Sequence, residues 1–231
     1  MFNYFKRFLK DAELIESKKV LNGEELTEEI RLTSLAKLLK KKTWTSVSSL
    51  GLIMINLAYN NMQIQWYIQN LAAYKRYLTD EVQKMLYDFN LNERSAASVI
   101  NAFKHIVLTP LGTVLNFGKF YAPNIIERNY CKLSNNIVLL YAIYKFAQTC
   151  NLGLEFNLSC LLNKSIVYDC PSPVEIFGIL DIEGESGIRS RLMGLSAVYS
   201  DLIHVTFTND LQTIIIQDIA PCEVLKIFSE E

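Results

Sequence analysis

The sequence predicts a mainly α-helical α+β protein with small β-hairpins, built from tandem winged-helix modules packed in one body. Apolar residues recur at helical spacing over most of the chain. Two stretches, residues 18–32 and 202–218, instead alternate about turn signals at residues 22–23 and 209–210, which is typical of hairpins. Helices flank both hairpins, and helices followed by a two-stranded wing are the order of a winged helix.

The chain is long enough for more than one domain. Its 231 residues exceed the usual size of a single domain. We expect a partial winged helix with its wing over residues 1–45, a helical region with a helix-turn-helix over residues 46–134, and a C-terminal winged helix over residues 135–231. The sequence has no repeat of 20–50 residues and no low-complexity linker.

The first half of the chain reads as helix, hairpin and helix. Residues 2–16 carry apolar side chains at helical spacing, and Thr33 is placed to cap a helix after the first hairpin. Residues 46–78 read as helical and strongly apolar. Their aromatic side chains are expected in the core rather than in a base-stacking surface; they are Trp66, Tyr67, Tyr74 and Tyr77.

Residues 79–107 predict a helix-turn-helix. Thr79 precedes one amphipathic helix, and a second begins near Glu93. We expect its inner face to contain Ala97, Ile100, Phe103 and Ile106. The opposite face is small, polar and basic, so it is the candidate DNA-reading surface, with Arg94, Ser98, Asn101, Lys104 and His105. The competing interpretation is an ordinary amphipathic helix pair that contacts only protein.

The C-terminal third predicts another winged helix. The second helix above should end at Pro110, with turns at Gly112 and Gly118. Helices are expected from Asn136 and again after Ser186, which would act as a cap. Arg189 and Arg191 would form a second DNA face on the latter helix, ahead of the final hairpin.

Charge supports nucleic-acid contact only locally. The net charge of the chain is −1, so the overall field does not require a polyanionic partner. Between Arg94 and Lys145, however, the sequence has six basic residues and one acidic residue, Glu127, which gives that stretch a net charge of +5. Such a stretch can follow phosphates, and a solvated surface is the alternative. Charged residues make up 20% of the chain, which also fits a subunit that covers part of its surface with partners.

Catalytic and metal signatures are missing from the sequence. The five cysteines are scattered without a CxxC pair, so we expect reduced thiols in a cytoplasmic protein. The N-terminus is not a signal peptide, and no apolar run is long enough to span a membrane. Asp11 with Glu16 and Lys18 only faintly matches the metal-binding pattern of restriction nucleases. We expect no metal, no cofactor, no small-molecule substrate and no enzymatic activity.

Several short segments, spread over roughly residues 5–228, resemble an uncharacterised bacterial family. In order, they include "QWYIQNL", "SAASVINAFKHIVLTPLGTVLNFG", "NNIVLLYAIYKFAQ", "SPVEIFGI" and "HVTFTNDLQTIIIQD". Members of that family are encoded beside phosphoadenosine-phosphosulfate-reductase-like proteins in DNA-phosphorothioation and other phage-defence islands. The resemblance implies no catalytic residues. Family members carry more sequence ahead of the first wing, so the first module here is expected to be incomplete.

Three functions follow as expectations. The first is a non-enzymatic DNA-binding or adaptor subunit in a phosphorothioation-type defence complex, with DNA and the other protein subunits as partners. The second is a protein-binding scaffold whose winged helices hold a partner and never contact DNA. The third is a winged-helix transcription regulator, which would be a dimer on a palindromic site.

Overall fold

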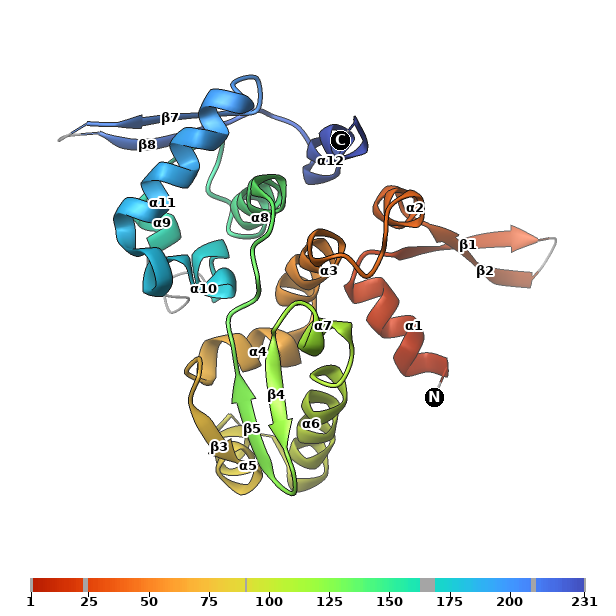
Figure 1. Ribbon diagram of the computed structural model, residues 1–231. Helices are drawn as coiled ribbons and strands as arrows, with labels where there is room; N and C mark the ends of the chain where they lie inside the picture. Colours follow the sequence, from red (N-terminus) through yellow and green to blue (C-terminus); the bar gives the residue numbers. More distant parts are fainter. Residues whose placement is uncertain (1, 23–24, 90, 163–168, 209–210, 231) are drawn as a thin grey trace.

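A computed structural model describes residues 2–22, 25–89, 91–162, 169–208 and 211–230. It has the mixed α+β character that the sequence predicts, with helices joined by small antiparallel sheets (Figure 1). The helices are α1 (Phe2–Asp11), α2 (Ser34–Lys41), α3 (Val47–Asn60), α4 (Met62–Asn70), α5 (Thr79–Asp88), α6 (Glu93–Ile106), α7 (Pro110–Thr113), α8 (Asn136–Thr149), α9 (Ser159–Leu162), α10 (Pro173–Phe177), α11 (Ile179–Val198) and α12 (Pro221–Glu230). The strands are β1 (Ile15–Asn22), β2 (Glu25–Leu32), β3 (Arg76–Leu78), β4 (Gly118–Tyr121), β5 (Ile125–Arg128), β6 (Glu155–Asn157), β7 (Ile203–Phe207) and β8 (Gln212–Ile216).

Both expected hairpins are confirmed. Strands β1 and β2 pair antiparallel, with Ile15 opposite Leu32, and β7 and β8 pair with Ile203 opposite Ile216. The hairpins extend from the body of the molecule on opposite sides (Figure 1). The expected turn residues Gly23, Asn209 and Asp210 lie outside the described residues. Thr33 caps α2 as expected, because its side chain accepts a hydrogen bond from the Ala36 backbone N–H.

The structure contains a three-stranded sheet that the sequence did not predict. Its strand order is β3-β5-β4, and it replaces the helix expected to run to residue 78. The C-terminal sheet has the equivalent order, β6-β8-β7. Residues 110–113 form the short helix α7 instead of a turn, because Thr109 caps it and Pro110 suits its first position. Gly112 lies inside this helix, where an added Cβ would fall 1.8 Å from the carbonyl oxygen of Val107.

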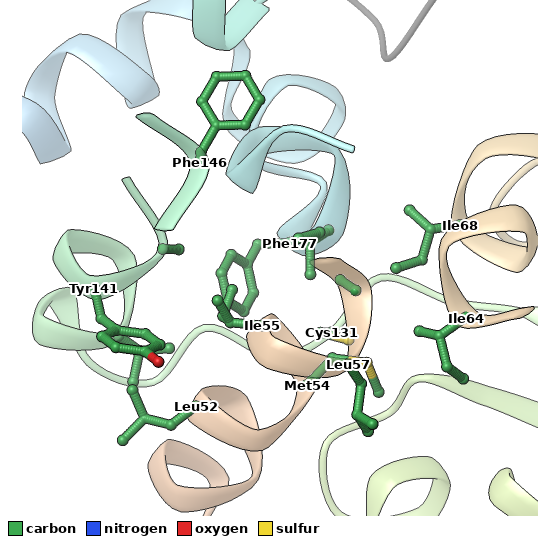
Figure 2. Close-up of a cluster of buried hydrophobic side chains, with 14 of the residues drawn as sticks. Leu52, Met54, Ile55, Leu57, Ile64, Ile68, Cys131, Tyr141, Phe146 and Phe177 are labelled. Atoms are coloured by element: carbon green, nitrogen blue, oxygen red, sulfur yellow. The ribbon is translucent and has the colours of Figure 1, made fainter. Parts of the chain in front are cut away.

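Helix α3 forms the centre of the hydrophobic core. Its residues from Ser49 to Ala58 are all buried, so side chains on every face of the helix need apolar neighbours. Helices α4, α8 and α10 supply many of them, and Figure 2 shows the resulting cluster. The labelled members are Leu52, Met54, Ile55, Leu57, Ile64, Ile68, Cys131, Tyr141, Phe146 and Phe177. A helix that is apolar around its circumference is stable in water only when it is covered in this way.

A buried amide holds α3 in register. Asn56 has no exposed surface, and its Nδ2 donates to the backbone oxygen of Ala12 at 3.2 Å. The hydroxyl of Tyr141 in α8 donates to Asn56 Oδ1 at 2.7 Å. One side chain therefore joins the end of α1, the middle of α3 and the face of α8. An amide without these partners would lower the stability of the core by about 1–3 kcal/mol.

Helix α11 is interrupted near its start. Gly184 has φ 70° and ψ −179°, a conformation that only glycine adopts readily. The expected cap at Ser186 is therefore wrong, because the break lies two residues earlier and the helix already starts at Ile179. Glycine also decides the preceding junction. Gly178 ends α10 and begins α11 with φ +64°, and an added Cβ would lie 2.1 Å from the Tyr130 ring.

Gly178→Ala should destabilise the protein strongly. A left-handed backbone at alanine and the clash with Tyr130 together should lower the free energy of unfolding by about 2–4 kcal/mol. Gly194→Ala is the matched control, because nothing lies within 4 Å of its added Cβ and its position is helical. The control should be neutral or gain up to about 1 kcal/mol. Urea unfolding of both variants measures the difference, and equal stabilities would contradict the assigned role of Gly178.

Candidate nucleic-acid interface

The α5–α6 pair presents the candidate interface. Asn92 caps α6, since its side chain accepts from the Ser95 backbone N–H at 2.9 Å. Phe103 on the inner face of α6 packs against Tyr67 of α4, with ring centroids 4.5 Å apart. Tyr67 in turn donates to the carbonyl oxygen of Glu127 on β5. Helix α6 is therefore fixed against both α4 and the three-stranded sheet.

The predicted inner face of α6 is partly wrong. Ala96, Val99, Ile100 and Phe103 are buried, whereas Ala97 is exposed. Ile106 is half-buried. The buried stripe thus lies slightly to one side of the predicted one, because the helix packs toward α4 as well as toward α5.

The predicted outer face is largely accessible. Arg94, Ser98, Asn101 and His105 are exposed and recur at helical spacing along one side of α6. Lys104 is half-buried, with its Nζ 5.1 Å from the centre of the Phe120 ring on β4. No described side chain forms an ion pair with Arg94. This surface carries two bases, a histidine and two small polar groups without an ion-paired acid.

The basic stretch of the sequence does not form one surface. Lys145 is buried in α8, where its Nζ lies 2.6 Å from Glu13 Oε1. Arg128 is only 5% exposed and donates to the carbonyl oxygens of Leu71 and Glu175. Burial lowers the pKa of Arg128 from its ordinary value. These two bases join parts of the body and cannot follow phosphates.

Lys119, on β4 of the three-stranded sheet, does not lie on the same surface as the outer face of α6. Phe120 faces α6, and strand alternation therefore turns Lys119 toward the opposite side of the sheet. Glu127 lies on that side as well, where it pairs with Arg76 at 3.2 Å. The hydroxyl of Tyr121 also donates to this carboxylate. Of the six bases in the stretch, α6 presents Arg94 and Lys104.

The second predicted face, on α11, has paired arginines. Arg189 contacts Glu185 Oε1 through Nη2 at 2.6 Å and lies over the ring of Phe207. Arg191 holds Glu183 through two nitrogens, at 2.5 and 2.8 Å. The hydrogen bonds from Arg191 lower the pKa of the Glu183 carboxyl. Both arginines therefore have an ion-paired carboxylate, whereas Arg94 has none among the described side chains.

A cavity of about 460 Å³ adjoins the C-terminal half of α6. Its walls come from α1, α4 and α6, and His105 is part of them. The apolar side chains at its rim are unusually accessible, with Tyr4 80%, Phe5 59% and Met62 73% exposed. Apolar spacing predicts the helix that contains Phe5, but it cannot predict this groove, because the groove depends on how helices distant in sequence pack against one another.

Neither a metal centre nor a membrane span is found in the described ranges. No group of three or more His, Cys, Asp or Glu side chains there could hold a metal ion. Asp11 of the faint nuclease pattern ends α1 and accepts from Asn61, while Glu16 and Lys18 lie exposed on β1. No helix in the described part of the chain has the length and apolar character to cross a bilayer.

Comparison with known proteins bears on the fold. No protein-family model and no curated protein matches the sequence. The SspB crystal structure matches with a TM-score of 0.70 and 14% identity, over 97% of this chain and 73% of that chain. The chain shares its fold with SspB. A magnesium ion-bound SspB crystal structure gives a TM-score of 0.67 and 12% identity over the same shares.

The pairing on α11 yields a test. Replacing both Glu183 and Glu185 by glutamine releases Arg191 and Arg189 while keeping side-chain size. If α11 contacts DNA, duplex affinity at low salt should rise by roughly two- to threefold, since each exposed pair is worth under about 1 kcal/mol. Fluorescence anisotropy measures the duplex affinity. The control is Glu223→Gln on α12, where Glu223 pairs with Lys226. Unchanged affinity would exclude α11 from the interface.

Proposed function

We propose that this chain is a non-enzymatic DNA-binding or adaptor subunit of a bacterial DNA-modification system of the phosphorothioation type, active in phage defence. The observation that carries the proposal is the outer face of α6, which is polar and basic and lies on a helix fixed from behind. The resemblance of the sequence segments to a family encoded in phosphorothioation islands supplies the context.

Tandem winged-helix modules are part of this proposal. A helix, a strand, three helices and a hairpin follow one another as α4, β3, α5 to α7, and β4–β5. The order recurs from α8 through β6, α9 to α11, and the β7–β8 hairpin, with matching sheet orders. In a winged helix the helix before the hairpin is the one that enters the DNA groove. The last long helix before the hairpin is α6 in the first set, where only the four-residue α7 follows it, and α11 in the second.

Contact by α6 would combine two kinds of recognition. Arg94 and Lys104 would neutralise phosphates, which provides salt-dependent affinity without sequence preference. Ser98 and Asn101 are short enough to reach base edges, and an Asn side chain can pair with adenine through two hydrogen bonds. The interface remains small, so we expect weak binding by this chain alone and tighter binding within a complex.

The test of the α6 interface is a charge-matched pair of variants. Arg94→Ala with Lys104→Ala should weaken binding to a short labelled duplex by about tenfold or more, and should reduce the salt slope by about 1.8. Fluorescence anisotropy between about 50 and 200 mM salt measures both quantities. The control, Lys119→Ala with Lys226→Ala, removes equal charge from other surfaces. A salt slope that is the same in both variants would rule out α6 as the phosphate contact.

A non-enzymatic role has its own test. One of the matching SspB structures is bound to magnesium, so the purified chain should be incubated with supercoiled plasmid and magnesium chloride. We expect the plasmid to remain supercoiled, as it does in the presence of EDTA. Magnesium-dependent nicking that purifies with the chain and disappears in an Asp11→Asn variant would contradict the proposal.

The protein-binding scaffold is the second candidate, and a specific feature favours it. The cavity between α1, α4 and α6 is lined largely by apolar side chains and has accessible aromatic residues at its rim. Accessible apolar patches of this kind often mark protein contacts. A tight complex with a neighbouring subunit, combined with no duplex binding at about 50 mM salt, would support this candidate over DNA contact. A dimer on a palindromic site would instead support the transcription regulator.

A further inference from the structure

Two cysteines that are distant in sequence meet beside α10. The Sγ atoms of Cys150 and Cys170 lie 2.7 Å apart, although the residues are 20 positions apart in the chain. Both are thiols in this structure. Cys160 lies midway between them in the sequence. Cys160 is a half-buried thiol that packs against the core, but it takes no part in the contact between the other two sulfurs.

The backbone on each side fixes the two sulfurs. Cys150 is the C-terminal cap of α8, and its N–H donates to the Phe146 carbonyl at 2.9 Å. Cys170 precedes Pro171 and Ser172, and Ser172 begins α10 through reciprocal hydrogen bonds with Glu175. Since α8 and α10 pack against each other, the approach of the sulfurs follows from rigid elements. A movement of less than 1 Å would bring them to the length of an S–S bond, about 2.05 Å.

We propose that Cys150 and Cys170 form a peroxide-sensitive dithiol that closes to an intramolecular disulfide. Cys150 is the half-buried member and can meet an oxidant, whereas Cys170 is 4% exposed. The reagent class is hydroperoxides, with hydrogen peroxide as the simplest. This site is separate from the α6 surface, and its test does not depend on DNA binding.

The order of the two steps follows from this asymmetry. The hydrogen bond from the Cys170 thiol lowers the pKa of Cys150 and raises that of Cys170. The Cys150 thiolate therefore attacks one peroxide oxygen, so that an S–O bond forms, the O–O bond breaks and hydroxide leaves. Cys170 sulfur then attacks Cys150 sulfur, so that the S–S bond forms, the S–O bond breaks and the oxygen leaves as water with the Cys170 proton. The hydroxide from the first step becomes the second water by taking up the proton that Cys150 released. Two thiols are oxidised to one disulfide, and one peroxide is reduced to two waters.

The Cys150–Cys170 disulfide would stiffen the junction at which α4, α8 and the start of α10 meet. The carbonyl oxygen of Asp169 accepts a hydrogen bond from the side chain of Gln65 in α4. A disulfide at the next residue would therefore link α8 and the start of α10 to a segment already held by α4. Tyr59 of α3 lies near the two cysteines. Burial is the main cause that raises the pKa of its hydroxyl, and the charges of Cys170 and Cys150 raise it further.

The test uses the full chain with Cys222→Ser as the parent, because Cys222 is exposed and could join two molecules. After hydrogen peroxide, denaturation and maleimide labelling, the parent should lose two reactive thiols. A non-reducing digest should contain one peptide pair joined at Cys150 and Cys170, and dithiothreitol should separate it. Cys170→Ser should stop at a dimedone-reactive Cys150, Cys150→Ser should leave Cys170 reduced, and the control Cys160→Ser should behave as the parent.

The melting temperature provides a second readout on the unsubstituted chain. A disulfide across a 20-residue loop should raise it by about 5 °C or more, and dithiothreitol should reverse the rise. Retention of both labelled thiols in the peroxide-treated parent would overturn the site. Sulfinic acid on Cys150 without a joined peptide would do the same. A joined peptide without any rise in melting temperature would overturn the stiffening of the junction.

Discussion

Burial of α3 on every side is the constraint on which the other parts of the fold depend. A helix that places Leu52, Met54, Ile55 and Leu57 around its circumference cannot lie on a surface. Helices α4, α8 and α10 have to enclose it. The Asn56 amide then restricts the positions of its neighbours, because its Nδ2 donates to the Ala12 carbonyl and its Oδ1 accepts from the Tyr141 hydroxyl. The three predicted modules consequently share one hydrophobic core.

The packing of helices around α3 also explains why two nearby basic side chains stabilise the fold instead of contacting a partner. Lys145 lies in α8, the helix that contacts α3 most closely along its length, and it is neutralised by Glu13 from the turn after α1. Arg128 reaches the end of α4 and the carbonyl of Glu175 in α10. Both bases therefore join elements that already pack around α3. These two bases are therefore not available to a partner, whereas the exposed bases on the outer face of α6 are.

Local sequence signals predicted local structure well. Turn residues and alternation located both long hairpins, and an oxygen-bearing side chain before an apolar run located the start of α2. Strands β3, β4 and β5 were missed, because three or four residues are too few to show a period. The polar face of α6 was visible in the sequence. The burial of Lys145 was not, because its partner lies 132 positions away. The contact between Cys150 and Cys170 depends on packing in the same way.

The position of α3 also affects how the chain folds during synthesis. Its last residue, Asn60, precedes Asn136, the first residue of the covering helix α8, by 76 positions. At about 5–20 residues per second, the apolar surface of α3 waits roughly 4–15 s on the ribosome before α8 is made. Contacts of such large sequence separation form slowly and leave apolar helices open to aggregation meanwhile. For that interval of translation, the apolar surface of α3 lacks the helix that covers it in the finished protein.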